Sequence, residues 1–210
     1  MPRAIQTGVA FTDEQLGDQV ATMILAGHET TATALFWALF LLALDSASQD
    51  QLAAEVQSAT VNGALDVERL KFTRAVVDES MRLYPPAFLI ARAAAGPDTI
   101  AGRPVKKKDV ILIAPWLLHR HEKLWRDPNA FIPSRFMPGT PPPDRFAYLP
   151  FGVGARVCIG AHFALVEATL ALAKMIGAFR VELLDKEPVI PVGVVTTQPD
   201  RSPMFRITAR

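Results

Sequence analysis

The sequence predicts a mainly α-helical protein with small antiparallel β-sheets, an α+β fold, and three observations support this. Apolar and small residues recur at helical spacing across residues 13–44, a run longer than most helices of soluble proteins. Short β-favouring runs separated by Gly and Pro occupy residues 88–115. A second apolar, helix-forming run begins at Ala161, directly after a glycine-rich loop that contains the only cysteine.

Length and composition limit the class of protein before any motif is considered. The chain has 210 residues, half of them apolar, so it can bury a sizeable core. Its net charge of +1, from 22 basic and 21 acidic residues, argues against a nucleic-acid partner. One cysteine excludes an internal disulfide and fits a reducing compartment. Residues 1–8 lack the apolar core of a signal peptide, so we expect a cytoplasmic protein.

The longest helix is expected at residues 13–44, about 48 Å in length at 1.5 Å per residue. Thr12 and Gln15 form a capping-box pattern at its start. Its clean apolar part, residues 32–44, is shorter than the roughly 20 residues that a membrane span needs. We therefore expect no membrane span but a buried helix that crosses the whole molecule. Glycine and hydroxyl residues at 26–31 interrupt the apolar pattern, which favours a local widening or kink.

The other elements follow from periodicity and from turn residues. Helices are expected at residues 46–59, 72–83 and 161–178, with a short helix capped by Asp66. Asn62-Gly63 indicates a turn, and Pro85-Pro86 ends the third helix. One small antiparallel sheet is expected within residues 88–115, with strands at 88–94, 99–101 and 110–114. Three further β-favouring runs lie at 179–184, 189–196 and 204–208.

Residues 151–160, Phe-Gly-Val-Gly-Ala-Arg-Val-Cys-Ile-Gly, place Cys158 on a loop ahead of a helix. Glycine allows positive φ and a close approach of another group to the backbone. The positive end of the helix dipole and the nearby Arg156 both favour the thiolate. These residues alone leave three possibilities open: a soft metal ligand, a nucleophile, or a buried and inert cysteine.

Phe, Gly, Gly, Arg, Cys and Gly at these spacings resemble the haem-binding loop of the cytochrome P450 family, with six matched positions in ten. The resemblance implies that Cys158 is the proximal thiolate ligand of haem b iron. Phe151 would pack beside the thiolate, with Gly152 in the same loop, and the loop amides would hydrogen-bond the sulfur. Arg92 and Arg156 would bind the haem propionates, although a strand arginine such as Arg92 is otherwise usually solvated.

The polar interruption Ala26-Gly27-His28-Glu29-Thr30-Thr31 resembles the distal-helix motif of the same family. By that resemblance, Glu29 and Thr30 would pass protons to bound dioxygen, and Gly27 would leave room for it. The hexapeptide by itself is equally consistent with a helix that has a polar stripe.

Glu79 and Arg82 lie three apart on the helix expected at 72–83, and so share a face. A pair at this spacing is often solvated, but here the surrounding sequence resembles the family's Glu-x-x-Arg helix. Arg135, in Pro133-Ser134-Arg135-Phe136, matches the third member of the buried network found in the family. Ser134 stands where the family usually has an acid.

The matched motifs occur in family order and cover nearly all of residues 1–210, with an irregular meander at 119–150. The chain is similar to the C-terminal half of a bacterial-type, soluble cytochrome P450. The resemblance implies part of a haem-thiolate monooxygenase that hydroxylates a small organic substrate with electrons from a ferredoxin or flavoprotein reductase. Two alternatives remain: a non-catalytic haem-binding fragment that self-associates or needs a polypeptide with the N-terminal half, and a thiol-nucleophile enzyme that uses Cys158.

Overall fold

The computed structural model describes residues 11–210, and the expectation for residues 1–8 lies outside them. The longest element is helix α2 (Asp13–Leu44), which has the expected bounds. The Thr12 hydroxyl accepts a hydrogen bond from the Gln15 amide, and the Gln15 side chain accepts one from the Thr12 amide. Residues 26–31 are α-helical like the rest of the helix, so the expected local widening does not occur. Thr30 accommodates its hydroxyl by donating to the Ala26 carbonyl, at 2.7 Å.

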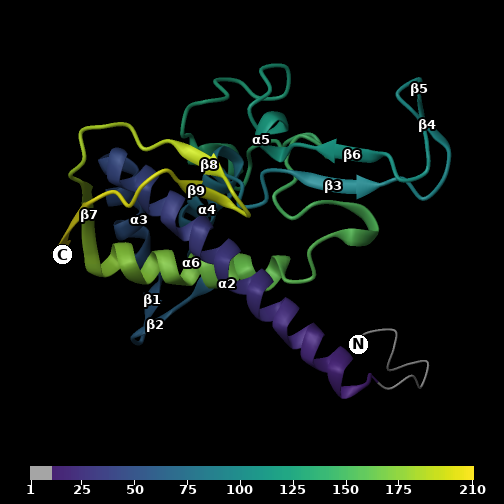
Figure 1. Ribbon diagram of the computed structural model, residues 1–210. Coiled ribbons are helices and arrows are strands. Elements are labelled where there is room, and N and C mark those ends of the chain that lie inside the picture. Colours follow the sequence, from purple (N-terminus) through teal and green to yellow (C-terminus); the bar gives the residue numbers. More distant parts are fainter. Residues whose placement is uncertain (1–10) are drawn as a thin grey trace.

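Only the C-terminal half of α2 is buried. Trp37 and Leu42 have no exposed surface, whereas Leu25 is 74 % exposed and residues 12–28 are all exposed. Figure 1 shows the N-terminal half of α2 extending away from the other elements. The expectation of a helix buried from end to end is therefore wrong, because no described segment packs against its first half. By length and composition alone α2 and the later helix α6 (Ala161–Ala178) could cross a membrane, but core helices of soluble proteins pass the same test.

Three further helices surround the buried half of α2: α3 (Ser46–Ala59), α4 (Lys71–Leu83) and α6 (Ala161–Ala178). Helix α4 begins one residue earlier than expected. The core between the four helices is aliphatic, and its members with no exposed surface are Leu42, Leu52, Ala59, Val76, Leu172, Ala173 and Ile176. Where α3 meets α6 the approach is very close, because a Cβ built on Gly177 would lie 2.7 Å from Cγ1 of Val56.

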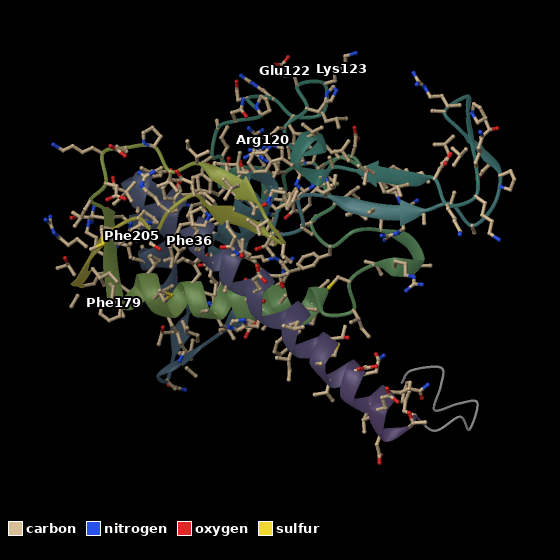
Figure 2. All side chains as sticks on the ribbon, in the orientation of Figure 1. Phe36, Arg120, Glu122, Lys123, Phe179 and Phe205 are labelled. Atoms are coloured by element: carbon tan, nitrogen blue, oxygen red, sulfur yellow. The ribbon has the colours of Figure 1, made fainter. Side chains whose placement is uncertain are left out.

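A second cluster forms where α2 meets the C-terminal strands. Trp37 stacks on Tyr84 with ring centroids 3.9 Å apart, and its indole N–H donates to the Thr197 carbonyl at 2.7 Å. Phe36 and Phe205 meet edge to face at 6.4 Å, and Figure 2 shows the two side by side. Aromatic pairs with this geometry add to the stability that burial alone provides.

Gln49 of α3 connects three elements through its side chain, which is 1 % exposed. Its Nε2 donates to the carbonyls of Leu42 and Val181, both at 2.9 Å. Its Oε1 accepts the Val181 amide at 2.9 Å. A buried amide with its hydrogen bonds made in this way stabilises one arrangement of the helices against the strand.

Within residues 11–210 the strands form five separate antiparallel pairs. They are β1 (Thr60–Val61) with β2 (Ala64–Leu65), β3 (Ile90–Ala93) with β6 (Val110–Ile113), β4 (Asp98–Ile100) with β5 (Arg103–Val105), β7 (Phe179–Leu183) with β10 (Phe205–Ala209), and β8 (Pro191–Gly193) with β9 (Thr197–Pro199).

Two expectations about these strands are wrong. Residues 88–115 form two hairpins rather than one sheet, because Ala101 and Gly102 both adopt positive φ and reverse the chain after β4. The β4–β5 hairpin lies at the far end of the β3–β6 ribbon in Figure 1. The run 189–196 is not one strand, since the chain turns at 194–196 and returns as β9.

Short helices and irregular backbone connect the remaining elements. Helix α5 (Pro115–Leu118) precedes the meander, within which lies the 3-10 helix η2 (Pro133–Phe136). Asp66 caps the 3-10 helix η1 (Val67–Arg69), where a short helix was expected. A third 3-10 helix, η3 (Gly154–Arg156), lies inside the cysteine loop, which α6 follows directly.

Candidate functional site

The cysteine loop, residues 151–160, holds an exposed thiol on a backbone with defined hydrogen bonds. The Cys158 amide donates to the Phe151 carbonyl at 2.9 Å, which closes the loop on itself. Gly152 and Gly154 adopt φ of 70° and 79°, a region that side-chain-bearing residues rarely occupy. Within residues 11–210 the sulfur has no hydrogen-bond partner, so the expected amide contacts to it are not formed in this structure.

Apolar side chains next to the thiol are open to the surface. Val157 is 54 % exposed, Ile159 88 % and Phe163, in the first turn of α6, 71 %. Exposed apolar groups gathered in this way mark a surface that binds something apolar. The thiol and its apolar neighbours therefore suit a flat apolar group that offers a soft metal to sulfur.

Arg92 and Arg156, the expected propionate ligands, are both exposed. Arg92 lies on β3, and its Nη1 donates to the neighbouring Ala91 carbonyl at 2.8 Å. Arg156 ends η3, two residues before Cys158. Among the described residues neither arginine pairs with a carboxylate, so both guanidinium groups are free for an acidic ligand.

The polar centre of α2 faces the β8–β9 hairpin. Glu29 Oε1 accepts the Thr196 hydroxyl at 2.9 Å and the Gln198 amide at 3.1 Å. No sequence pattern indicates Thr196 or Gln198, because only the turn at 194–196 brings them to α2. A Cβ on Gly27 would meet no atom within 4 Å, so α2 is open at this point.

A surface pocket of about 480 Å³ lies beside Glu29, between α2 and the C-terminal strands. His28, Glu29 and Gln198 supply its polar wall, and Phe36 and Phe205 its aromatic wall. The pocket does not include Cys158 or any other residue of the cysteine loop.

Glu79, Arg82 and Arg135 form one buried network. Arg82 binds both carboxylate oxygens of Glu79, with Nε 2.7 Å from Oε2 and Nη2 2.8 Å from Oε1. Arg135 Nε lies 3.4 Å from Glu79 Oε1, which also accepts the Ile132 amide at 2.8 Å. The Glu79 and Arg82 side chains have no exposed surface, so a solvated surface pair is excluded.

The remaining donors of Arg82 hold the meander. Nη1 donates to the carbonyls of His119 and Pro128, at 2.8 and 2.6 Å, and Nη2 donates to Ala130 at 2.9 Å. The guanidinium also lies over the Trp125 ring, 5.0 Å from its centroid. Arg82 therefore organises an irregular segment that has few backbone hydrogen bonds of its own.

Comparison with known proteins places this geometry in a family. A long helix packed against α6, the helix that follows the cysteine loop, together with a buried Glu-Arg-Arg network, is typical of a class of mainly α-helical cofactor-binding proteins. The family model "Cytochrome P450" matches residues 3–202, and the chain belongs to the cytochrome P450 family. Members of this family bind haem b.

Three curated relatives illustrate the match. Cyclooctatin synthase of Streptomyces melanosporofaciens is 40% identical over 89% of this chain and 41% of its own length. Pentalenene oxygenase of Streptomyces avermitilis is 34% identical over 98% and 46%. Protein LUTEIN DEFICIENT 5, chloroplastic, of Arabidopsis thaliana is 35% identical over 91% and 33%. The chain thus spans less than half the length of these relatives.

The residues of this chain fit haem b. The donor set offers a soft ligand in the Cys158 thiol, which binds iron as the thiolate. Exposed apolar side chains border the thiol, and Arg92 and Arg156, which make no salt bridge within residues 11–210, carry the positive charge and the paired donors that bind carboxylates. A Cβ on Gly160 would lie 3.9 Å from Sγ, an ordinary contact distance, so the sulfur is not enclosed by its own loop.

Proposed function

We propose that this chain forms the haem-binding and dioxygen-activating part of a haem-thiolate monooxygenase, and corresponds to the C-terminal half of a cytochrome P450. The observation that supports this most directly is the exposed Cys158 thiol on the closed, glycine-containing loop at the start of α6. Family membership supports the general chemistry, in which dioxygen and two electrons give a hydroxylated organic product and water.

Haem b, once bound, supplies the iron centre that activates dioxygen. Cys158 would hold the metal, and the hydrogen bond from its amide to the Phe151 carbonyl fixes its backbone for that role. Phe151 and Gly152 belong to the same loop, and Arg92 and Arg156 would bind the propionates. Ile159 and the neighbouring apolar side chains would contact the ring and exclude water.

Helix α2 carries the residues proposed for proton delivery. Glu29 and Thr30 would deliver protons, and Gly27 would leave space for dioxygen. The hydrogen bonds from Thr196 and Gln198 hold the Glu29 carboxylate toward the β8–β9 hairpin, so the acid has a fixed starting position. A small organic substrate would bind on this side, and a ferredoxin or flavoprotein reductase would supply electrons. The reducing compartment and the bacterial relatives favour a cytoplasmic enzyme.

The test is the absorption spectrum of the reduced, carbon-monoxide-bound protein, compared between the parent, Cys158→His and Cys158→Ser. The parent should show the red-shifted Soret band of thiolate ligation. The histidine variant should keep haem but lose that band, and the serine variant should lose the band or the haem. An unchanged spectrum in both variants would exclude Cys158 as the ligand.

A second reading has support from one observation. The exposed apolar surface of α2 indicates that this chain associates with another polypeptide, either one with the N-terminal helices or a second copy. In that case the chain alone is a non-catalytic haem-binding fragment. The thiol-nucleophile reading is weaker, because no hydrogen bond joins Cys158 to a histidine or carboxylate within residues 11–210.

A further inference from the structure

His119 connects the buried ion network to the segment that leads into the cysteine loop. It follows α5, and none of its surface is exposed. Its side-chain Nε2 accepts the Leu149 amide at 2.8 Å, and its own carbonyl accepts Arg82 Nη1 at 2.8 Å. One residue therefore bonds to the buried ion network through its backbone and to the segment just before the cysteine loop through its ring.

We propose that His119 is a positioning residue that fixes the start of the cysteine loop, and through it the thiol, by accepting the Leu149 amide. The hydrogen bond to Leu149 is independent of haem, but its effect on the thiolate ligand rests on the proposed role of Cys158. Two short bridges lead from Leu149 to the cysteine: the Gly152 amide donates to the Leu149 carbonyl at 3.2 Å, and the Cys158 amide donates to the Phe151 carbonyl at 2.9 Å.

Tyr148 adds a second attachment beside the first. Its hydroxyl donates to the carbonyl of Asp78 on α4 at 2.9 Å, and its ring lies 5.2 Å from the His119 ring. Residues 148 and 149 are thus held from two sides, one through a side chain and one through a backbone amide. The chain enters the loop from a fixed direction because both attachments are buried or half-buried.

A histidine suits this place because its neutral ring is a hydrogen-bond acceptor at one nitrogen. Nε2 accepts the Leu149 amide, so the ring proton is on Nδ1. Nδ1 faces the carbonyls of Met81 and Arg82 without reaching the geometry of a hydrogen bond. An apolar side chain here would leave the Leu149 amide buried without a partner, which is costly.

The surroundings keep the ring neutral. Burial is the main cause that lowers the pKa of His119 to about 4; the backbone groups of Met81 and Arg82 oppose this shift, and the guanidinium groups of Arg82 and Arg120 act in the same direction as burial. The groups that face the ring from other segments are Arg82 and the Tyr148 hydroxyl, which is bonded to Asp78. Nε2 therefore remains an acceptor at neutral pH and becomes a donor only in acid.

The first test needs no haem. Amide hydrogen exchange of Leu149 is measured in the apoprotein for the parent, His119→Gln and His119→Asn. Glutamine carries an oxygen near the place of Nε2, whereas asparagine is too short to reach Leu149. The Leu149 amide should exchange at least about tenfold faster in the asparagine variant, the effect of one lost hydrogen bond. The glutamine variant should stay near the parent, as should the surface control His121→Gln. Equal Leu149 exchange in all four proteins would overturn the proposal.

The second test uses haem-loaded protein and the thiolate Soret band from about pH 7.5 to about pH 3, a range that extends below the pKa of His119. The parent should lose the band as His119 becomes protonated near pH 4, and the glutamine variant should keep it to lower pH. The asparagine variant should lose it at higher pH than the parent. A band with the same pH dependence in all variants would overturn the proposal. If the parent never shows the band but Leu149 exchange still follows His119, then the haem assignment fails and the positioning role of His119 stands.

Discussion

Arg82 Nε lies 2.7 Å from Glu79 Oε2, and neither side chain has any exposed surface. The same guanidinium donates to three meander carbonyls, so the ion pair also shapes the segment that leads to the cysteine loop. A buried charge with all its partners in place is tolerated, but removal of one partner leaves the other uncompensated.

Arg82→Ala should therefore destabilise the protein by roughly 3–5 kcal/mol, because Glu79 would remain buried without its cation. Urea unfolding followed by circular dichroism measures this. The control is Lys71→Ala, which removes an exposed pair with Glu68 and should change stability by less than about 1 kcal/mol. Similar small losses in both variants would mean that the buried pair contributes no more than a surface pair.

Stability should fall as the pH is lowered from 6.5 toward 4, because of His119. The folded protein holds the pKa of this residue at about 4, below its ordinary 6.5, so the unfolded chain binds a proton that the folded chain does not. The contribution is complete above pH 6.5 and lost by about pH 4, a change of about 3 kcal/mol. Urea unfolding at pH 7.5 and 4.5 should show a smaller loss for His119→Gln than for the parent. The same loss in both proteins would assign the acid sensitivity to other groups.

Gly177→Ala should destabilise the contact between α3 and α6. The new Cβ would lie 2.7 Å from Cγ1 of Val56, and overpacking typically costs about 1–3 kcal/mol, more than the ~0.5–1 kcal/mol that alanine contributes within a helix. Thermal unfolding should show a lower midpoint. Gly17→Ala is the matched control, since its Cβ meets no atom within 4 Å and should raise the midpoint slightly. Adding Val56→Ala to the Gly177 variant should recover part of the loss; no recovery would place the strain elsewhere.

Thr30→Val should leave haem binding intact but divert reducing equivalents to peroxide in a complete or reconstituted enzyme, because the hydroxyl no longer takes part in proton delivery. Thr22→Val is the control, because the Thr22 hydroxyl donates to the Asp18 carbonyl at 2.7 Å, as the Thr30 hydroxyl does to the Ala26 carbonyl nearer the middle of the same helix. The measurement is the ratio of peroxide formed to reductant consumed. Equal ratios for the two variants would count against a distal role for Thr30.

The isolated chain should self-associate, or bind a polypeptide that covers the first half of α2. Met23, Ile24 and Leu25 are 58 %, 64 % and 74 % exposed on consecutive positions. Replacing Ile24 and Leu25 by Gln should shift sedimentation toward the monomer, because less apolar surface is left to bury. A parent protein that sediments as a stable monomer and hydroxylates substrate with good coupling would contradict this prediction.

Regular helices could be predicted from the sequence because local signals determine them. The Thr12 cap and the apolar period predicted the bounds of α2, and the apolar run that begins at Ala161 predicted those of α6. The β8–β9 hairpin was missed because Val-Val-Thr-Thr at 194–197 has the composition of a strand. The hydrogen bond from the Trp37 indole to the Thr197 carbonyl holds the chain where it returns as β9.

Residues of the candidate site could be predicted only where they belong to a sequence motif. Cys158, Glu79 and Arg135 belong to recognisable patterns, and the Arg135 contact spans 56 positions that local signals do not connect. Thr196, Gln198 and His119 act through tertiary contacts that span 30 positions or more, so no spacing rule could find them. Which half of α2 is exposed could not be predicted, because an apolar period shows which face is suited to a partner and not whether one is present.

Gln49 sets an order of events during synthesis. Its side chain comes early in the chain, but its partner Val181 and the strand β10 that pairs with β7 come more than 130 residues later. While the ribosome still holds those strands, the amide has only the Leu42 carbonyl to bind. The helices can collapse first, but the core closes only after translation has delivered β7 and β10. Nascent chains should therefore remain protease-sensitive around α3 until the last strands emerge.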